Sequence, residues 1–146
     1  MNQPMATALF QAAALTFEEL GFLFSNEDLA PEQKLAEPDG VVSITFRGPF
    51  NGRLVLRVCG DILPGIATSM LGDDEPPSVE LQHDVLGELG NVVCGNALPL
   101  MAGRTEVFHL SAPSLVYDNV PEETATAKTQ IGLEQGRADV LLFIEK

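Results

Sequence analysis

The chain has 146 residues and a formal net charge of −13 at pH 7, with 21 acidic residues against 8 lysines and arginines. This length suits a single domain, residues 1–146, and 45% hydrophobic with 20% charged residues is typical of an ordered globular protein. The acidic balance excludes nucleic acid and anionic membrane surfaces as partners.

The N-terminus, Met-Asn-Gln-Pro, has no basic residues of the kind found in a signal peptide. No apolar run approaches the roughly 20 residues that a membrane span needs. We therefore expect a cytoplasmic protein that does not enter a membrane.

The first half of the chain predicts one helix and one hairpin. Apolar residues at helical spacing predict a helix over residues 5–20. Residues 25–40 carry acidic side chains together with Pro and Gly, which predicts a polar loop. Residues 41–47 and 53–58 alternate in the strand sense around Gly48-Pro49-Phe50-Asn51-Gly52, which predicts a β-hairpin.

The second half predicts two helices and three strands. Asp61 can cap a short helix that ends near Gly72. Ser78 can cap a long helix that runs to about Pro99. Later strands are expected at residues 106–110, 128–133 and 137–145. The spacing Gly-x-x-x-Gly-Arg occurs at residues 48–53 and again at 132–137, which suggests two related hairpins. The predicted fold class is α+β, with an antiparallel sheet of hairpins packed against long helices.

The long helix has two different faces. One is apolar and is expected in the core: Val85, Leu86, Leu89, Val92, Val93 and Ala97. The opposite stripe consists of Glu80, Asp84, Gly87, Glu88, Asn91 and Gly95. The Cβ atoms of Glu88 and Asn91 are expected roughly 5–6 Å apart. Gly87 and Gly95 bracket this pair, so the stripe presents bare backbone that another molecule can approach. The alternative is a solvated face whose glycines pack tightly, and the pattern alone favours that alternative.

The remaining reactive side chains form no known motif. Cys59 and Cys94 have no metal-ligand spacing, and buried structural thiols are expected, although Cys94 near the stripe could be a redox-sensitive thiol. His83 and His109 are isolated and have no nucleophile or second ligand nearby. We therefore predict no metal site and no cofactor bound by this chain.

The ten residues Glu88-Leu89-Gly90-Asn91-Val92-Val93-Cys94-Gly95-Asn96-Ala97 resemble the signature helix of the CheX/CheC/FliY chemotaxis phosphatases, closest to CheX. Weaker similarity covers most of the chain. It includes the first-helix ending Phe17-Glu18-Glu19-Leu20-Gly21-Phe22, the hairpin at residues 46–56, and the helix Ile66-Ala67-Thr68-Ser69-Met70-Leu71-Gly72. The resemblance implies a single-domain CheC/CheX-like fold.

The resemblance also implies a function, the dephosphorylation of the aspartyl phosphate of a CheY-like response-regulator receiver domain in chemotaxis or two-component signalling. Asn91 and Glu88 would be catalytic: Asn91 positions the attacking water, as a glutamine does in Ras-type GTPases, and Glu88 docks on the receiver's lysine. Asp84, Gly87, Glu88 and Gly95 would contact the partner. Mg²⁺ is expected on the receiver and not on this chain.

Three further expectations follow. The other asparagines have no glutamate three residues earlier, and Glu18 and Glu19 are followed at that spacing by Gly21 and Phe22, which indicates one site, as in CheX, and not two, as in CheC.

The resemblance implies a homodimer; the apolar run 140–144 would support it as an edge strand, but it suits a buried central strand equally well. The alternative function is a non-catalytic receiver-binding or flagellar-switch-like module. A weaker one is an unrelated acidic interaction domain.

Overall fold

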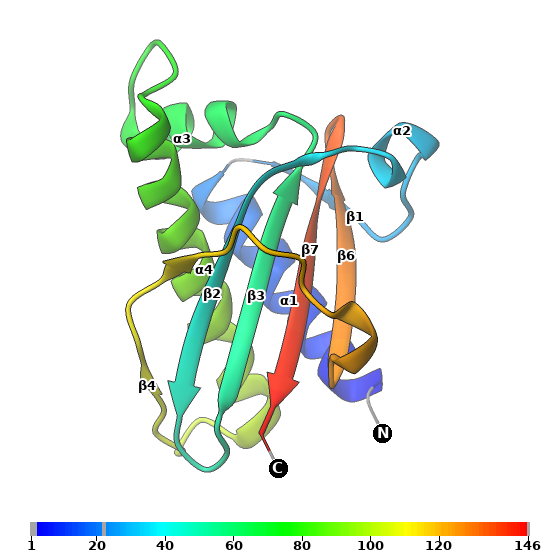
Figure 1. The fold of residues 1–146 in the computed structure, drawn as a ribbon, viewed down its shortest axis with the longest axis vertical. Coiled ribbons are helices and arrows are strands. Elements are labelled where there is room, and N and C mark those ends of the chain that lie inside the picture. The colour runs from blue at the N-terminus through cyan, green and yellow to red at the C-terminus, as the bar shows by residue number, and fades with distance from the viewer. Residues whose placement is uncertain (1–2, 22, 146) are drawn as a thin grey trace.

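The computed structural model describes residues 3–21 and 23–145, so Phe22 of the first-helix resemblance lies outside the described residues. One antiparallel sheet carries long helices on one face and an irregular segment on the other (Figure 1). The helices are α1 (Gln3–Leu20), α2 (Pro31–Lys34), α3 (Leu63–Leu71) and α4 (Val79–Ala102), with a 3₁₀ turn η1 (Glu122–Thr124). The strands are β1 (Ser25–Asn26), β2 (Pro38–Arg47), β3 (Gly52–Cys59), β4 (His109–Leu110), β5 (Ser114–Leu115), β6 (Ala127–Leu133) and β7 (Gly136–Ile144). The predicted α+β class is confirmed.

The strand order is β1-β6-β7-β3-β2-β4, and β5 also pairs with β2. Both predicted hairpins are present, β2 with β3 and β6 with β7, and β3 joins them by pairing with β7. The first half of the chain contributes α1 and the β2–β3 hairpin, and the second half contributes α4 and the β6–β7 hairpin. Helix α1 packs on β6 and α4 packs on β2, so the helix of each half covers the outer strand of the other half. This exchange ties the two halves into one core.

The run 140–144 lies in β7, between β6 and β3, at the centre of the sheet. Val140 and Leu142 join the core under the helices, and Leu141 is buried on the opposite face. The central-strand alternative is therefore correct. The edge-strand interpretation is wrong, because both backbone edges of β7 are already paired.

Several predicted boundaries change. Residues 25–40 hold β1, α2 and the start of β2, and residues 106–110 contribute only the two-residue β4. Helix α4 passes through Pro99 to Ala102. A proline there leaves the carbonyl four residues earlier without its donor. That residue is Gly95, which is exposed, so its carbonyl is open to water.

Asp61 does not cap α3, as the sequence predicted. It has a positive φ of 57°, and the N-cap position belongs to Ile62. Asp39 of β2 caps this helix from outside: its carboxylate accepts hydrogen bonds from the backbone N–H groups of Asp61 (2.7 Å), Ile62 (2.8 Å) and Leu63 (2.9 Å). The predicted end at Gly72 is confirmed, with a left-handed φ of 72°.

The outer face of the sheet is crossed by residues 116–126, which run from β2 towards β6 (Figure 1). A buried network anchors this segment. Asp139 of β7 accepts from Arg57 (2.7 Å) and Arg137 (2.9 Å), and Arg57 also pairs with Glu122 of η1 (3.2 Å). The second guanidinium arm of Arg137 binds the backbone carbonyls at the end of α2. Both η1 and α2 are thus held on this face by arginines that share the Asp139 carboxylate.

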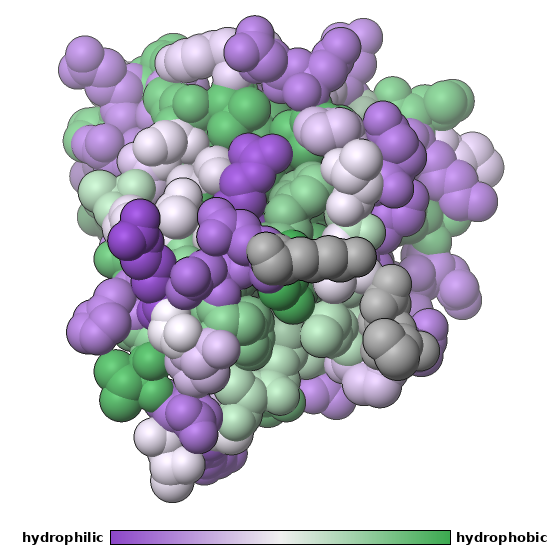
Figure 2. Space-filling model, turned by 60° about the horizontal axis from the view of Figure 1, so that its bottom comes forward, coloured by the Kyte–Doolittle hydropathy of each residue, from purple (hydrophilic) through white to green (hydrophobic). Residues whose placement is uncertain are grey.

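The end of the molecule near the β2–β3 turn and the C-terminus shows hydrophobic surface between polar side chains (Figure 2). Phe46, Phe50 and Phe108 stack edge to face there, with ring centroids 5.1–5.9 Å apart. Phe46 is buried, and the other two close the core at this end.

Among the described residues, α4 alone is long and apolar enough to cross a membrane by length and composition. Half of its apolar window is buried inside the protein, as in the core helix of a globular domain. The finding is weak evidence for a span.

Candidate active site

Helix α4 presents the two faces that the sequence predicts. Ser78 caps it, since its hydroxyl accepts a hydrogen bond from the N–H of Leu81 at 3.2 Å. The apolar side packs into the core: Val85, Leu86, Leu89, Val93 and Ala97 are buried, and Val92 is half-buried. A Cβ added at Gly90 would lie 2.9 Å from Cγ1 of Val42, so this glycine lets α4 approach β2 closely. The approach places this turn of the helix, which also carries Glu88 and Asn91, beside β2.

The polar stripe is open to solvent at the predicted pair. Glu80, Asp84, Glu88 and Gly95 are exposed, and Asn91 is half-buried. Within the described residues, no hydrogen bond joins the Glu88 carboxylate or the Asn91 amide to another side chain or to the backbone elsewhere. Both polar groups are therefore available to an external molecule.

The pair lies in a groove and not on a flat surface. The groove has a volume of about 680 Å³. Its helix wall is formed by His83, Asp84, Gly87, Glu88 and Asn91, its floor includes Val42, and its second wall is formed by Pro113, Ser114, Leu115 and Tyr117. The structure thus brings together Asp84, Gly87, Glu88 and Asn91, and it leaves Gly95 outside the groove lining.

The expectation of bare backbone at Gly87 is wrong. Gly87 is buried, and a Cβ there would lie 3.1 Å from Cβ and 3.2 Å from Cγ of Pro113. This glycine makes room for Pro113 of the second wall. At Gly95 the expectation agrees with the structure, because nothing lies within 4 Å of an added Cβ.

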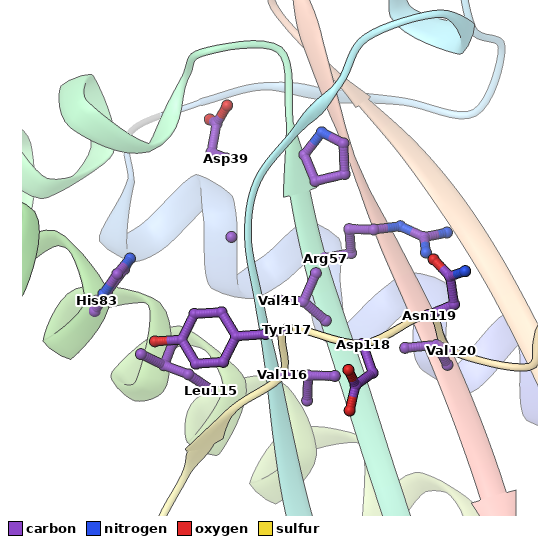
Figure 3. A pocket seen from close by; sticks show the side chains of 12 residues that line it. Asp39, Val41, Arg57, His83, Leu115, Val116, Tyr117, Asp118, Asn119 and Val120 are labelled. Carbon is purple, nitrogen blue, oxygen red and sulfur yellow. The ribbon is translucent and has the colours of Figure 1, made fainter.

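A second hollow of about 310 Å³ adjoins the groove. The two share His83, Leu115 and Tyr117, and the hollow extends to Asp39, Arg57 and Asp118 (Figure 3). Arg57 is held by Asp139 and Glu122. His83 thus lies at the junction of two hollows, a position that its isolation in the sequence does not indicate.

The cysteines and Asn96 are structural. Cys59 and Cys94 are buried, and burial raises the pKa of the Cys94 thiol to about 12 and that of Cys59 to about 11. Such thiols stay protonated at neutral pH, which argues against a redox-sensitive Cys94. The Asn96 amide donates to the Thr16 hydroxyl of α1 at 3.3 Å, so it joins the two long helices.

Helix α1 offers a counterpart to the groove on the other half. A hollow of about 310 Å³ is lined by Gln3, Ala6, Thr7 and Phe10 of α1, by Thr129 and Gln130 of β6, and by Glu27. Thr7 and Phe10 have the spacing that Glu88 and Asn91 have on α4, but neither supplies a carboxylate or an amide. The described chain has one groove with the Glu-x-x-Asn pair.

The groove holds an exposed carboxylate and an unbonded carboxamide one helical turn apart, and no lysine or arginine lines it. The described residues contain no cluster of three or more His, Cys, Asp or Glu that could hold a metal ion. An amide can orient a water molecule and a carboxylate can bind a cation. The groove can therefore bind a cation through Glu88 and a water molecule through Asn91.

The family model for the chemotaxis phosphatase CheX matches residues 41–133. The chain belongs to the CheX family. No curated protein matches it.

Solved structures of this family share the fold over nearly the whole chain. CheX from Vibrio vulnificus has a TM-score of 0.74 at 17% identity, with 99% of each chain covered. CheX from Borrelia burgdorferi, solved as a CheX-CheY-BeF3-Mg²⁺ complex, has a TM-score of 0.64 at 14% identity, covering 96% of this chain and 97% of that one. FliY from Thermotoga maritima has a TM-score of 0.58 at 16% identity, covering 98% of this chain and 85% of that one.

Proposed function

We propose that this protein dephosphorylates the aspartyl phosphate of a CheY-like receiver domain. The observation that carries the proposal is the unbonded Asn91 amide one turn from the exposed Glu88 carboxylate in a single groove. Membership of the CheX family and the Borrelia complex of CheX with CheY support the choice of partner.

Asn91 is the catalytic residue of this proposal. Its carboxamide accepts a hydrogen bond from a water molecule and holds the water oxygen in line with phosphorus. The water oxygen bonds to phosphorus as the bond to the receiver's aspartate breaks, so inorganic phosphate, a carboxylate and one proton are produced. A neutral amide serves this step because it does not repel the phosphoryl oxygens.

Glu88 holds the receiver in register through a charge-assisted hydrogen bond to the lysine of the receiver's phosphorylation site. The receiver supplies that lysine together with its Mg²⁺. The groove itself has no lysine or arginine to bind phosphate, and the whole chain has only 8 of these residues. A phosphatase that uses its partner's cations needs none of its own.

The second candidate is a module that binds a receiver without hydrolysis. The fold is shared with FliY as well as with CheX, so the fold alone does not distinguish this candidate from the phosphatase. Retention of an unbonded amide favours the phosphatase, because a docking module needs only the carboxylate.

The test is the decay of receiver domains of the same organism that have been phosphorylated with acetyl phosphate and Mg²⁺. Wild-type protein should accelerate decay, and Asn91→Ala should reduce the acceleration about 100-fold or more while binding is nearly unchanged, because the amide acts in the transition state. Asn26→Ala, an exposed asparagine on β1, is the control. An Asn91→Ala protein as active as wild type would remove the assigned role. Binding without acceleration by wild type would favour the second candidate.

We further propose that the protein acts as a homodimer. The family resemblance suggests it, and the open edge of β6 offers a place for it, as argued in the Discussion.

A further inference from the structure

The wall of the groove opposite α4 carries an exposed aromatic side chain. Tyr117 is 84% exposed and is the single tyrosine of a chain that has no tryptophan. One exposed aromatic residue needs no explanation by itself. The position of this one does, because Tyr117 lines both the groove with Glu88 and Asn91 and the adjoining hollow.

The segment that carries Tyr117 is tethered on both sides. Before it, Leu115 pairs with Val42, and the N–H of Val116 donates to the carbonyl of Val41 at 2.9 Å. After it, Glu122 pairs with Arg57 at 3.2 Å. The backbone at Tyr117 therefore keeps its place relative to α4, so less ordering of this segment is required when a partner binds.

The Tyr117 ring extends from this segment towards α4, with its hydroxyl on the side of His83 (Figure 3). The packing of Pro113 against Gly87 sets the separation of the two walls. A molecule that reaches Glu88 and Asn91 between these walls therefore meets the tyrosine ring.

The charges of the groove limit the kind of partner. Its charged lining residues are Asp84 and Glu88. The adjoining hollow carries Asp39 and Asp118 together with Arg57, whose charge is already paired with Asp139 and Glu122. The matching surface has a cation opposite the carboxylates and an apolar patch opposite the ring. A receiver domain provides the cation at its phosphorylation site under the proposed function.

We propose that Tyr117 is a docking residue for the receiver domain, packing its ring on apolar receiver surface beside the phosphorylated aspartate. This inference rests on the proposed function and adds to it a contact from the other wall of the groove. Tyrosine is frequent among residues that dominate binding, because it buries a large rigid ring at low entropic cost. The Tyr117 contact sets affinity, and Asn91 sets turnover.

The test compares Tyr117→Ala with Tyr117→Phe and with Phe24→Ala in steady-state dephosphorylation of the receiver and in binding of the receiver loaded with beryllofluoride and Mg²⁺. Phe24 is the matched control, since it is 86% exposed and lies next to β1 at the other edge of the sheet. Tyr117→Ala should raise KM and Kd about tenfold or more with kcat unchanged within about twofold. Tyr117→Phe, which keeps the ring, should restore most of the affinity, and Phe24→Ala should behave as wild type. Both sites are exposed, so equal melting temperatures are expected for the three variants.

The outcomes separate this inference from the proposed function. If wild type accelerates decay and Tyr117→Ala has the same KM and Kd as wild type, the docking role alone is overturned. The docking role is also overturned if Tyr117→Ala loses kcat at unchanged KM. Wild type that binds the loaded receiver without accelerating decay overturns the phosphatase, and the Kd series then decides Tyr117. Wild type that does neither overturns both.

A second measurement uses the single tyrosine. Protein labelled with 3-fluorotyrosine should give one ¹⁹F resonance from the chain, which shifts when the loaded receiver is added and does not shift in the Glu88→Lys variant. An unmoved resonance in wild type at saturating receiver contradicts the docking role.

Discussion

At the scale of single residues, two glycines of α4 determine how Glu88 and Asn91 are presented. Gly90 lets the helix approach Val42 of β2, and Gly87 lets Pro113 approach the helix. A glycine inside a helix costs about 1 kcal/mol relative to alanine. Here each cost is offset by a close contact that forms the floor or the second wall of the groove. Glu88 and Asn91 lie on the same turn of α4 as these two glycines.

Glu88→Ala should weaken receiver binding and turnover together, and Glu88→Lys should weaken them further, because a lysine would face the receiver's own lysine. Truncating one partner of a desolvated interfacial ion pair costs about 2–5 kcal/mol. Titration of the variants with loaded receiver measures the effect. Glu19→Ala, an exposed glutamate on α1, should bind as wild type.

Because Glu88 is exposed and unbonded, both Glu88 variants should fold with a free energy of unfolding within about 0.5 kcal/mol of wild type. A large fall in melting temperature would indicate a structural role for this stripe. Unchanged titration curves would remove Glu88 from the interface.

At the scale of elements, α3 begins where β2 supplies its cap. Asp39→Ala removes the acceptor of three backbone hydrogen bonds and should lower the free energy of unfolding by about 1–2 kcal/mol. Asp61→Gly should be neutral or slightly stabilising, because Asp61 is not the cap and holds a positive φ. Urea denaturation of both variants checks this. A larger loss of unfolding free energy in Asp61→Gly than in Asp39→Ala would show that Asp61 is the cap.

The difference between Asp39 and Asp61 also shows how far the sequence could predict the elements. Helix α4 was predicted with its cap and its core face, because Ser78 and the apolar periodicity are local signals. The cap of α3 is Asp39, which lies 22–24 positions before the N–H groups that it binds, so no local sequence pattern predicts it. Strand β5 has two residues, too few for an alternating pattern, and β1 is equally short.

In the candidate site too, the sequence predicted the local features and not the ones that depend on distant residues. Glu88 and Asn91 were predicted, because they share one helix and one motif. The groove was not, because its second wall comes from Pro113, Leu115 and Tyr117, which reach α4 only through pairing of β5 with β2. The same non-local pairing buries Gly87, which the helix pattern alone placed on an open stripe.

At the scale of the whole molecule, the sheet has one edge with an open ladder. On the β2 side, β4 and β5 pair with the outer edge at residues 42–43 and 46–47. On the other side, β1 pairs with β6 only at Gly132 and Leu133, so within residues 3–21 and 23–145 no strand pairs with the outer edge of residues 127–131. An open edge of this kind can pair with a second copy of the chain. The proposed homodimer is therefore expected to form through β6, now that β7 is known to be central.

Light scattering across a concentration series should show a mass of twice 15.6 kDa. Thr129→Lys, which places a charge on the open edge of β6, should yield a monomer, and Thr129→Val should remain dimeric. The groove lies at the β2 side of the sheet, away from β6, so the Thr129→Lys monomer should keep its phosphatase activity per chain. A mass that stays at 15.6 kDa at high concentration would rule out the dimer. A monomeric variant that loses activity would show that the second subunit contributes to the site, contrary to the placement of Glu88, Asn91 and Tyr117 within one chain.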